Sequence, residues 1–288
     1  MSNPAPARKY SQLSDEQRTI VTSKRADARH TPSEWIVMLG EIAAFDRVGD
    51  RDRSRAGWGC GTSIILSIIC LAVFWKAAIV PIVIAIIFGI RYSNLKKVDV
   101  PNSLRESLLP LLALLREDMD AAAVLRLTFD LRDGTRKENL LAEESLPPRR
   151  YLSLKESRYS NAWFSGEGVL ADGSSVAWEI TDLIRIHEVT KRSSSGKIKM
   201  KKKYRVRRVI DMRVGLRQDE YVWHGGGDAI DSLKVSTKSG DKRTVVKLRR
   251  VVEERNSLHP RFDVRYFIDT LAGAYRRASL AGEEGRKP

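Results

Sequence analysis

A row of cations between Lys197 and Arg207 is the feature of this sequence best suited to bind a ligand. Basic residues occupy six successive odd positions, whereas most even positions from Ile198 to Leu216 are apolar. Side chains alternate between the two faces of a strand, so the segment predicts a strand with one face on a core and one cationic face. The cations are Lys197, Lys199, Lys201, Lys203, Arg205 and Arg207.

The charge of the chain is concentrated around this row. The 288 residues carry a formal net charge of +15. Residues 93–288 hold 39 basic and 28 acidic residues, and residues 185–217 alone hold 13 basic and 2 acidic residues, so both ranges have a net charge of +11. Such a focused charge predicts an anionic partner: an anionic lipid, a nucleotide or other phosphorylated ligand, or nucleic acid. The alternative is a solvated edge strand on which lysines prevent aggregation.

No set of residues with catalytic spacing accompanies the basic row. The string from His224 to Gly227 resembles an oxyanion-hole sequence, but no G-x-S-x-G nucleophile elbow occurs. The string from Ser195 to Lys197 lacks the upstream glycine and the following Ser or Thr of a phosphate loop. The four histidines are scattered, and both cysteines, Cys60 and Cys70, lie in an apolar segment. We therefore expect a non-enzymatic protein that uses no metal ion and no cofactor.

Two long apolar runs predict a membrane hairpin. Residues 59–75 and 77–90 contain no charged side chain, and Lys76 separates them. One straight helix over residues 59–90 would be about 48 Å long, well beyond the roughly 30 Å hydrocarbon core, whereas two helices fit with a small mismatch. The alternatives are a hairpin buried in a soluble protein and a re-entrant hairpin. The residues expected at the membrane interface are Trp58, Trp75, Lys76, Arg91 and Tyr92.

The flanking charges predict the orientation of this hairpin. Basic residues flank both outer ends, whereas the connecting turn contains only Lys76. By the positive-inside rule both termini are cytoplasmic. The absence of cysteine outside the apolar segment also favours the reducing cytoplasm. We therefore expect an integral membrane protein, of the inner membrane if the source is bacterial. The flanking cations are Arg47, Arg51, Arg53, Arg55, Arg91, Lys96 and Lys97.

Helix and strand patterns surround the hairpin. Thr31 and Glu34 form a capping-box pattern before apolar residues at helical spacing, and Trp35 suits either packing on a domain or the bilayer interface. Ser103 and Glu106 open a second, leucine-rich helix. From residue 121 onward, at least six runs of alternating character predict consecutive antiparallel strands. A final amphipathic helix is expected after residue 260.

The predicted fold is an α+β membrane protein, with a two-helix transmembrane hairpin, a cytoplasmic antiparallel β-rich domain and flanking helices. Consecutive strands without intervening helices indicate a barrel or a sandwich. We expect an N-terminal cytoplasmic segment (1–56), the hairpin (57–92), a linker helix (93–120), the β-rich domain (121–258) and a C-terminal helix with a tail (259–288).

Two functions are compatible with this organisation. The first is a membrane-anchored, non-enzymatic binding or scaffold module whose basic strand binds an anionic partner. The second is a ligand-controlled effector that disrupts the bilayer, with the β domain as its sensor. The layout resembles that of bacterial anti-phage effectors that combine two transmembrane helices with a β-barrel sensor, and this resemblance in layout implies a defence or stress function. For either function we expect the lipid bilayer and a protein partner, or a second copy of the chain, as partners. Small and polar residues of the first run would permit close helix packing: Gly59, Gly61, Thr62, Ser63 and Ser67.

Overall fold

The computed structural model describes residues 10–73, 75–147, 151–193, 195–224, 233–255, 257–258 and 261–281. Its backbone forms two compact units that are discontinuous in sequence. The first unit comprises residues 1–25 and 36–105, and the second comprises residues 26–35 and 106–288. Residues 26–35 thus belong with the β-rich part of the chain.

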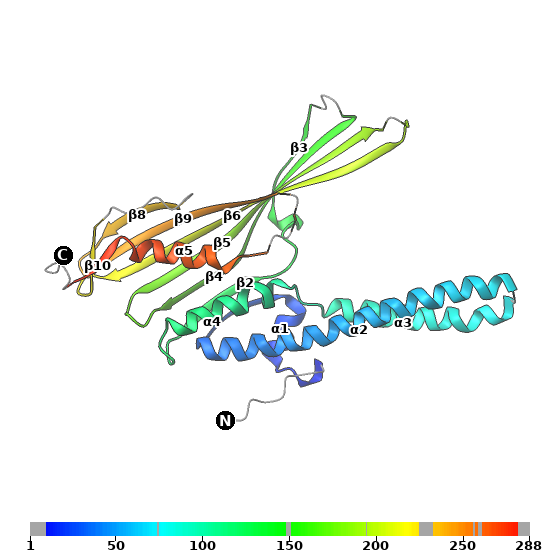
Figure 1. The fold of residues 1–288 in the computed structure, drawn as a ribbon, viewed down its shortest axis with the longest axis horizontal. Coiled ribbons are helices and arrows are strands. Elements are labelled where there is room, and N and C mark those ends of the chain that lie inside the picture. Colours follow the sequence, from blue (N-terminus) through cyan, green and yellow to red (C-terminus); the bar gives the residue numbers. More distant parts are fainter. Residues whose placement is uncertain are drawn as a thin grey trace. The chain divides into compact units, whose positions relative to one another are not determined.

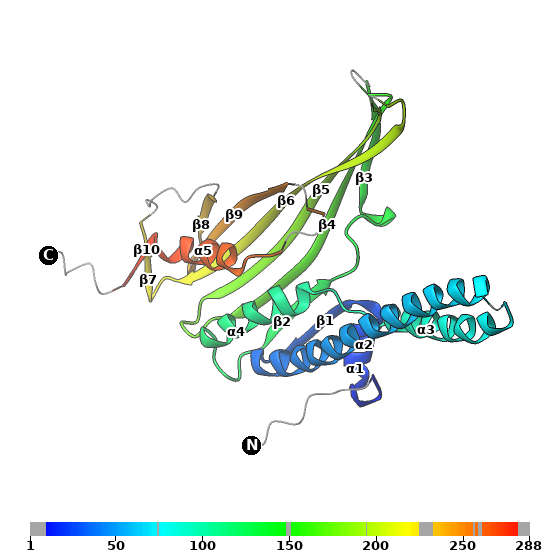
Figure 2. The same cartoon turned by 45° about the vertical axis from the view of Figure 1, so that its right-hand side comes forward.

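The first unit contains a hairpin of two long helices. A 3-10 turn, η1 (Tyr10–Gln12), precedes α1 (Asp15–Ser23). Helix α2 (Pro32–Val73) has 42 residues and is therefore about 63 Å long. A 3-10 turn, η2 (Trp75–Ala78), connects it to α3 (Ile79–Lys97), which lies beside α2 (Figures 1 and 2). The turn falls where the sequence predicts it.

Helix α2 unites two elements that the sequence suggests are separate. The capping box at its start is confirmed: the Thr31 N–H donates to Glu34 Oε2 over 2.8 Å, and the Glu34 N–H donates to Thr31 Oγ1 over 3.3 Å. The helix then continues through the charged stretch into the first apolar run. That stretch contains no proline, and the i,i+3 ion pair between Arg53 and Asp50 (2.6 Å) supports helical structure within it.

The second unit is built on one open antiparallel sheet, ordered β1-β2-β4-β5-β6-β9-β8, with β3 also paired to β4. A separate two-stranded sheet joins β7 to β10. A short helical turn, η4 (Lys137–Asn139), precedes β3. The strands are β1 (Arg25–His30), β2 (Leu125–Asp130), β3 (Leu140–Leu146), β4 (Ser153–Val169), β5 (Ser175–Arg192), β6 (Ile198–Arg217), β7 (Tyr221–Trp223), β8 (Leu233–Ser239), β9 (Arg243–Arg255) and β10 (Ala278–Leu280).

The antiparallel arrangement is confirmed, but the prediction of a barrel or sandwich is not met. In the part of the chain that the structure describes, the edge strands β1 and β8 do not pair with each other, so the sheet is not closed. Two helices cover one of its faces (Figures 1 and 2). They are α4 (Leu109–Glu117) and α5 (Val264–Tyr275), the latter being the expected final helix. Because these helices bury the apolar face, the fold needs no second sheet to cover it.

Aromatic side chains form the centre of the core between the sheet and α5. The ring of Trp178 lies 5.2 Å from that of Phe267 in an edge-on arrangement and 5.8 Å from that of Phe164. Leu111, Leu112 and Leu115 of α4 are fully or almost fully buried. A π-helical turn, η3 (Leu104–Leu108), precedes α4, next to Pro110, which lacks the N–H that would bond four residues back.

Trp35 belongs to the second unit and packs within it. Its side chain is completely buried, and its indole Nε1 donates to the Leu125 carbonyl over 2.9 Å. Its ring also meets His30 edge-on, with centroids 4.9 Å apart. Of the two interpretations of Trp35, packing on a domain is therefore confirmed. Strand β1, which the sequence patterns did not reveal, joins the sheet directly before this residue.

Candidate functional site

The basic row lies mainly on the face of the sheet opposite α4 and α5, which we call the free face. Strand alternation places the odd-numbered side chains of β6 there: Lys199, Lys201, Lys203, Arg205 and Arg207. Lys197 precedes the strand and lies in the β5–β6 turn, where its carbonyl accepts the Ser193 N–H over 2.8 Å. At this turn Gly196 has φ +77°, a left-handed conformation that glycine adopts without strain. The structure thus brings five of the six predicted cations onto one face.

Only part of this charge is neutralised. Arg205 binds Glu253 of β9 through both Nε and Nη2, the latter over 2.9 Å. Hydrogen bonds from Arg205 and Arg255 lower the pKa of Glu253 to about 2. Among the residues that the structure describes, no carboxylate pairs with Lys199, Lys201, Lys203 or Arg207. These four cations are therefore available to an external anion.

The strand register places like charges directly opposite one another. On the free face, Lys199 faces Lys191 of β5, and Arg205 lies between Arg185 of β5 and Arg255 of β9. Like charges in such cross-strand positions destabilise a sheet. Around Arg205 the protein already offsets this repulsion, because Glu253 pairs with Arg205 and Arg255, and Glu156 pairs with Arg185. In the described part of the chain no carboxylate pairs with Lys191 or Lys199, so an external anion would relieve the repulsion at this pair.

The far end of β6 differs from the sequence prediction. Ile198 and Met200 were expected on a core, but they are 66% and 67% exposed. Burial begins only near Tyr204, where a small cluster of Ile184, Ile186 and Val206 packs together. The reason is tertiary: the β5–β6 hairpin extends beyond α5 and α4 together with β3 and β4, and its last residues also lie past the start of β4 at Ser153 (Figures 1 and 2). We call its end the tip, comprising residues 191–193 and 195–203.

A buried carboxylate ties together the strands that lead to the tip. Glu156 of β4 is 2% exposed. It accepts from Arg185 at 2.8 Å and from Arg158 at 2.5 Å, and it lies 2.5 Å from His187 Nε2. Burial raises the pKa of Glu156, but the hydrogen bonds from Arg185, Arg158 and His187 outweigh it and lower the pKa to about 2. This carboxylate is already satisfied and serves as a structural link between β4 and β5.

A second basic region of the free face is a hollow of about 640 Å³ over β5, β6, β9 and β8. Arg213 and Lys247 stand directly opposite each other there, and Arg249 pairs with Asp211 over 3.6 Å. Lys234 of β8 faces Arg249 across the next strand pair. Sequence reasoning missed this region. The alternating cations of β9 were a possible signal, but the register that places them beside β6 is not visible in one sequence.

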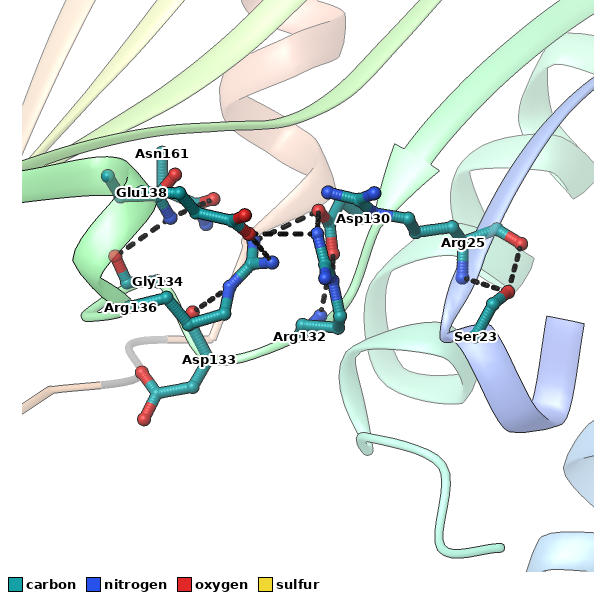
Figure 3. Close-up of polar contacts among 10 residues, drawn as sticks. Ser23, Arg25, Asp130, Arg132, Asp133, Gly134, Arg136, Glu138 and Asn161 are labelled. Carbon is teal, nitrogen blue, oxygen red and sulfur yellow. Dashed lines mark hydrogen bonds and ion pairs between the residues drawn. The ribbon is translucent and has the colours of Figure 1, made fainter.

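Other charged clusters are satisfied internally. In the β2–β3 connection, two arginines and two carboxylates form a network of ion pairs (Figure 3). Arg132 contacts Asp130 at 2.8 Å and Glu138 at 3.0 Å, and Arg136 contacts both carboxylates. This network orders the connection and leaves no charge for a ligand.

A second internal cluster lies beside a pocket of about 440 Å³ between the end of α4, the β4–β5 turn and α5. Asp172 accepts hydrogen bonds from the hydroxyls of Tyr221 (2.8 Å) and Tyr275 (2.9 Å). Burial raises the pKa of Tyr221 to about 12, and the bond to Asp172 adds to the shift. These bonds attach β7 and α5 to the β4–β5 turn, which explains the cluster structurally.

The two long helices meet along a seam of small residues. On α2, Ser63 and Ser67 are buried, and the Cys60 thiol donates to the Ala85 carbonyl of α3 over 3.6 Å. A Cβ atom built on Gly59 would lie only 2.9 Å from the ring of Phe88. The expectation of close packing is therefore confirmed for Gly59 and Ser63. Gly61 differs, because nothing lies within 4 Å of a Cβ built there.

The predicted interface residues lie at the ends of this hairpin. Trp58 is 75% exposed, and Tyr92 lies beside Gly57 on the neighbouring helix. Arg91 is 3.9 Å from Asp52. Trp75 and Lys76 both fall in the turn η2.

The base of the hairpin is held by three carboxylates and two arginines. Asp46, Asp50 and Asp99 lie close enough to share a metal ion. However, Arg105 contacts Asp46 (3.3 Å) and Asp50 (3.2 Å), and Arg53 pairs with Asp50 and Asp99. Burial raises the pKa of Asp46. The arginines explain the cluster as an ion-pair network that joins α2 to the segment after α3.

The histidines do not assemble into a catalytic set within the described residues. His187 binds Glu156, His30 packs on Trp35, and the His224 ring lies 2.6 Å from the Ser279 hydroxyl. His259 and the glycines of the string after His224 lie outside the described residues. Comparison of the chain with protein-family models, curated proteins and solved structures finds no match.

Proposed function

We propose that the protein is a membrane-anchored, non-enzymatic binding module: the α2–α3 hairpin spans the bilayer, and the basic strand of the sheet binds an anionic partner. The observation that carries this proposal is the inverted distribution of side chains on the hairpin. Its small and polar residues face the seam, whereas its largest apolar residues point outward. The outward residues, all 39–64% exposed, include Ile64, Ile65, Leu66, Ile68, Ile69, Leu71, Ile79, Val80, Ile82, Ile84, Ile86, Ile87 and Ile90.

Water is a poor solvent for this surface. Full burial of one such side chain contributes about 1.5–3 kcal/mol, so the outward residues together favour transfer into hydrocarbon strongly. In a buried core hairpin the candidate spans would be largely covered, whereas only 17% and 6% of the two apolar windows are buried. Large exposed apolar surfaces of this kind mark contact with a membrane or another protein.

The lengths of the helices are compatible with a bilayer. Residues 57–73 of α2 extend about 26 Å, close to the roughly 30 Å hydrocarbon core, and the uncharged part of α3, residues 79–90, extends about 18 Å. Arg91, Lys96 and Lys97 at the end of α3 can extend toward the headgroups and absorb the mismatch. The surplus of cations at both outer ends supports cytoplasmic termini.

Labelling of the native cysteines in the full chain tests the anchor. Cys60 and Cys70 lie within the apolar part of α2. In intact membranes we expect neither thiol to react with a water-soluble, membrane-impermeant maleimide, and both to react once the protein is denatured. Equal labelling in intact membranes and in denaturant would overturn the proposal.

A charge placed on the hairpin provides the second test. Ile68→Asp/Ile86→Asp introduces two carboxylates on the outward surface, each costing a few kcal/mol in hydrocarbon. We expect this variant to be released by alkaline extraction, whereas the parent stays in the membrane pellet. Val37→Asp is the matched control, because Val37 is 53% exposed on α2 but lies outside the apolar run. Release of the control together with the variant would indicate loss of folding instead.

The polar seam of the hairpin favours a second candidate function, a ligand-controlled effector that disrupts the membrane. Ser63 and Ser67 place hydroxyl groups between the two helices, and association of several hairpins could expose them to a shared interior. A voltage-sensitive dye in cells producing the full chain distinguishes the two functions. Depolarisation that Ile68→Asp/Ile86→Asp abolishes would support the effector, and a normal potential at confirmed membrane expression would support the binding module.

A further inference from the structure

We infer that the partner of the basic strand is a lipid surface: the tip of the β5–β6 hairpin inserts into the headgroup region of an anionic bilayer. This inference rests on the proposed function and names the partner of the same site. Its basis is that the tip exposes apolar and cationic side chains together, on a hairpin that extends past the helices covering the sheet (Figures 1 and 2).

The two kinds of side chain point to opposite faces of β6. Ile198 and Met200 alternate with Lys199, Lys201 and Lys203, and all five are exposed. At the same end of the sheet, Leu152 is 52% exposed, and its N–H donates to the Thr190 carbonyl over 2.8 Å. Exposed apolar side chains beside lysines characterise segments that lie in the membrane interface, where the apolar groups reach the acyl chains and the ammonium groups reach the phosphates.

The charge of the tip is positive throughout. The sequence from Lys191 to Lys203 contains seven basic residues and no acidic residue. Lys202 pairs with Glu188 of β5, and this pair lies on the opposite side from Lys199, Lys201 and Lys203. An anionic membrane surface attracts each nearby basic residue by an amount equivalent to roughly fivefold in affinity. The three lysines therefore contribute about 100-fold at low ionic strength.

The apolar side chains distinguish a bilayer from nucleic acid. A nucleic acid backbone would neutralise the lysines but would leave Ile198 and Met200 in water. Nucleic acid binding without sequence preference also uses aromatic platforms for the bases. Tyr204 is the aromatic residue of β6, and it lies on the covered side. A bilayer accommodates both the charge and the apolar surface of the tip.

The test uses the full chain in nanodiscs, with a polarity-sensitive fluorophore at the tip. Ser195 lies in the exposed β5–β6 turn, so Ser195→Cys in a Cys60→Ser/Cys70→Ser background gives one labelling site. We expect a blue shift and quenching by doxyl-labelled lipids when phosphatidylglycerol is present, and neither change in phosphatidylcholine alone. Doxyl-labelled lipids in the nanodisc report contact of the tip with the bilayer that anchors the chain. Doxyl-labelled lipids in added vesicles report contact of the tip with a second bilayer. Either contact supports the inference.

Two variants and one matched control define the site. Lys199→Gln/Lys201→Gln/Lys203→Gln should weaken vesicle association of the tip about 100-fold, and Ile198→Ser/Met200→Ser should abolish the blue shift. The control is Lys137→Gln/Lys238→Gln/Lys242→Gln, which removes equal charge from exposed positions in η4, β8 and the β8–β9 turn, outside both basic regions, and should leave both signals unchanged. Equal loss in the control and the lysine variant would show a general charge effect and overturn the inference.

The remaining outcomes also separate the two proposals. A chain that does not co-elute with nanodiscs contradicts the proposed function itself. A chain that co-elutes but whose tip is unquenched in every lipid mixture contradicts only the insertion of the tip. A blue shift produced by a DNA duplex and not by phosphatidylglycerol vesicles would assign the basic strand to nucleic acid and overturn the inference.

Discussion

The ion pair between Arg208 and Asp182 provides the sharpest test of the packing in the second unit. Arg208 of β6 and Asp182 of β5 face each other on the covered side of the sheet, joined by two hydrogen bonds of 2.7 Å. Both residues are buried, with 6% and 9% of their surface exposed. The guanidinium also lies 5.6 Å from the ring of Trp163 and 5.5 Å from that of Phe262.

Asp182→Asn would remove the carboxylate but keep the shape of the side chain. The guanidinium would then stay buried but lose the Asp182 carboxylate, and breaking one side of a buried pair costs about 3–5 kcal/mol. A double substitution, Asp182→Leu/Arg208→Met, removes both charges and fills the same space with apolar groups. Such replacements are often neutral or stabilising, so we expect the double variant to be more stable than Asp182→Asn.

Denaturant unfolding of the full chain in a nonionic detergent, followed by tryptophan fluorescence, measures these differences. The matched control is Asp27→Asn, because Asp27 pairs with Arg126 on the surface at 3.1 Å, with 55% and 43% of the two side chains exposed. An exposed pair contributes about 1 kcal/mol or less. If Asp182→Asn lowers the free energy of unfolding no more than Asp27→Asn, the proposed role of the buried pair is refuted.

Three further predictions concern other single side chains. Because the folded-state pKa of Glu156 is about 2, below the usual 4.5, its stabilising contribution is complete above pH 4.5 and decreases as the pH falls toward 2. The free energy of unfolding falls by at most about 3 kcal/mol over this range. In Glu156→Gln the free energy of unfolding should change less between pH 4.5 and 2 than in the parent, and parallel curves for the two proteins would contradict this prediction. Trp35→Phe removes the bond to the Leu125 carbonyl and should cost about 1–3 kcal/mol in denaturant unfolding, and an unchanged midpoint would argue against that bond. Gly59→Leu should move α2 and α3 apart, since the ring of Phe88 occupies the space that the leucine side chain would need. An unchanged distance between labels on α2 and α3 would contradict close packing of the two helices at Gly59.

The local patterns of the sequence were sufficient for most elements, but not for β1, for the continuity of α2 or for the partners of each element. The uncharged runs and the cations around them indicated two apolar helices with a turn near Trp75, because a bilayer limits the length of a helix. The capping box at Thr31 and Glu34 marked the start of α2, because its hydrogen bonds join residues three apart. Alternation in β6 likewise placed its cations on one face, since the period of a strand is a local property.

The tertiary structure decided which surfaces these elements cover. The burial of Trp35, the joining of β1 to the sheet and the open sheet beneath α4 and α5 all depend on contacts between residues distant in the chain. Ile198 and Met200 have the alternating pattern of core residues, yet they are exposed, because β5 and β6 are longer than the helices that cover the sheet. The basic hollow exists only because β9 pairs with β6, and β8 pairs with β9, each in one particular register. Side-chain periodicity determines the face of each residue, but only the packing of distant segments determines whether that face meets a core, water or a membrane.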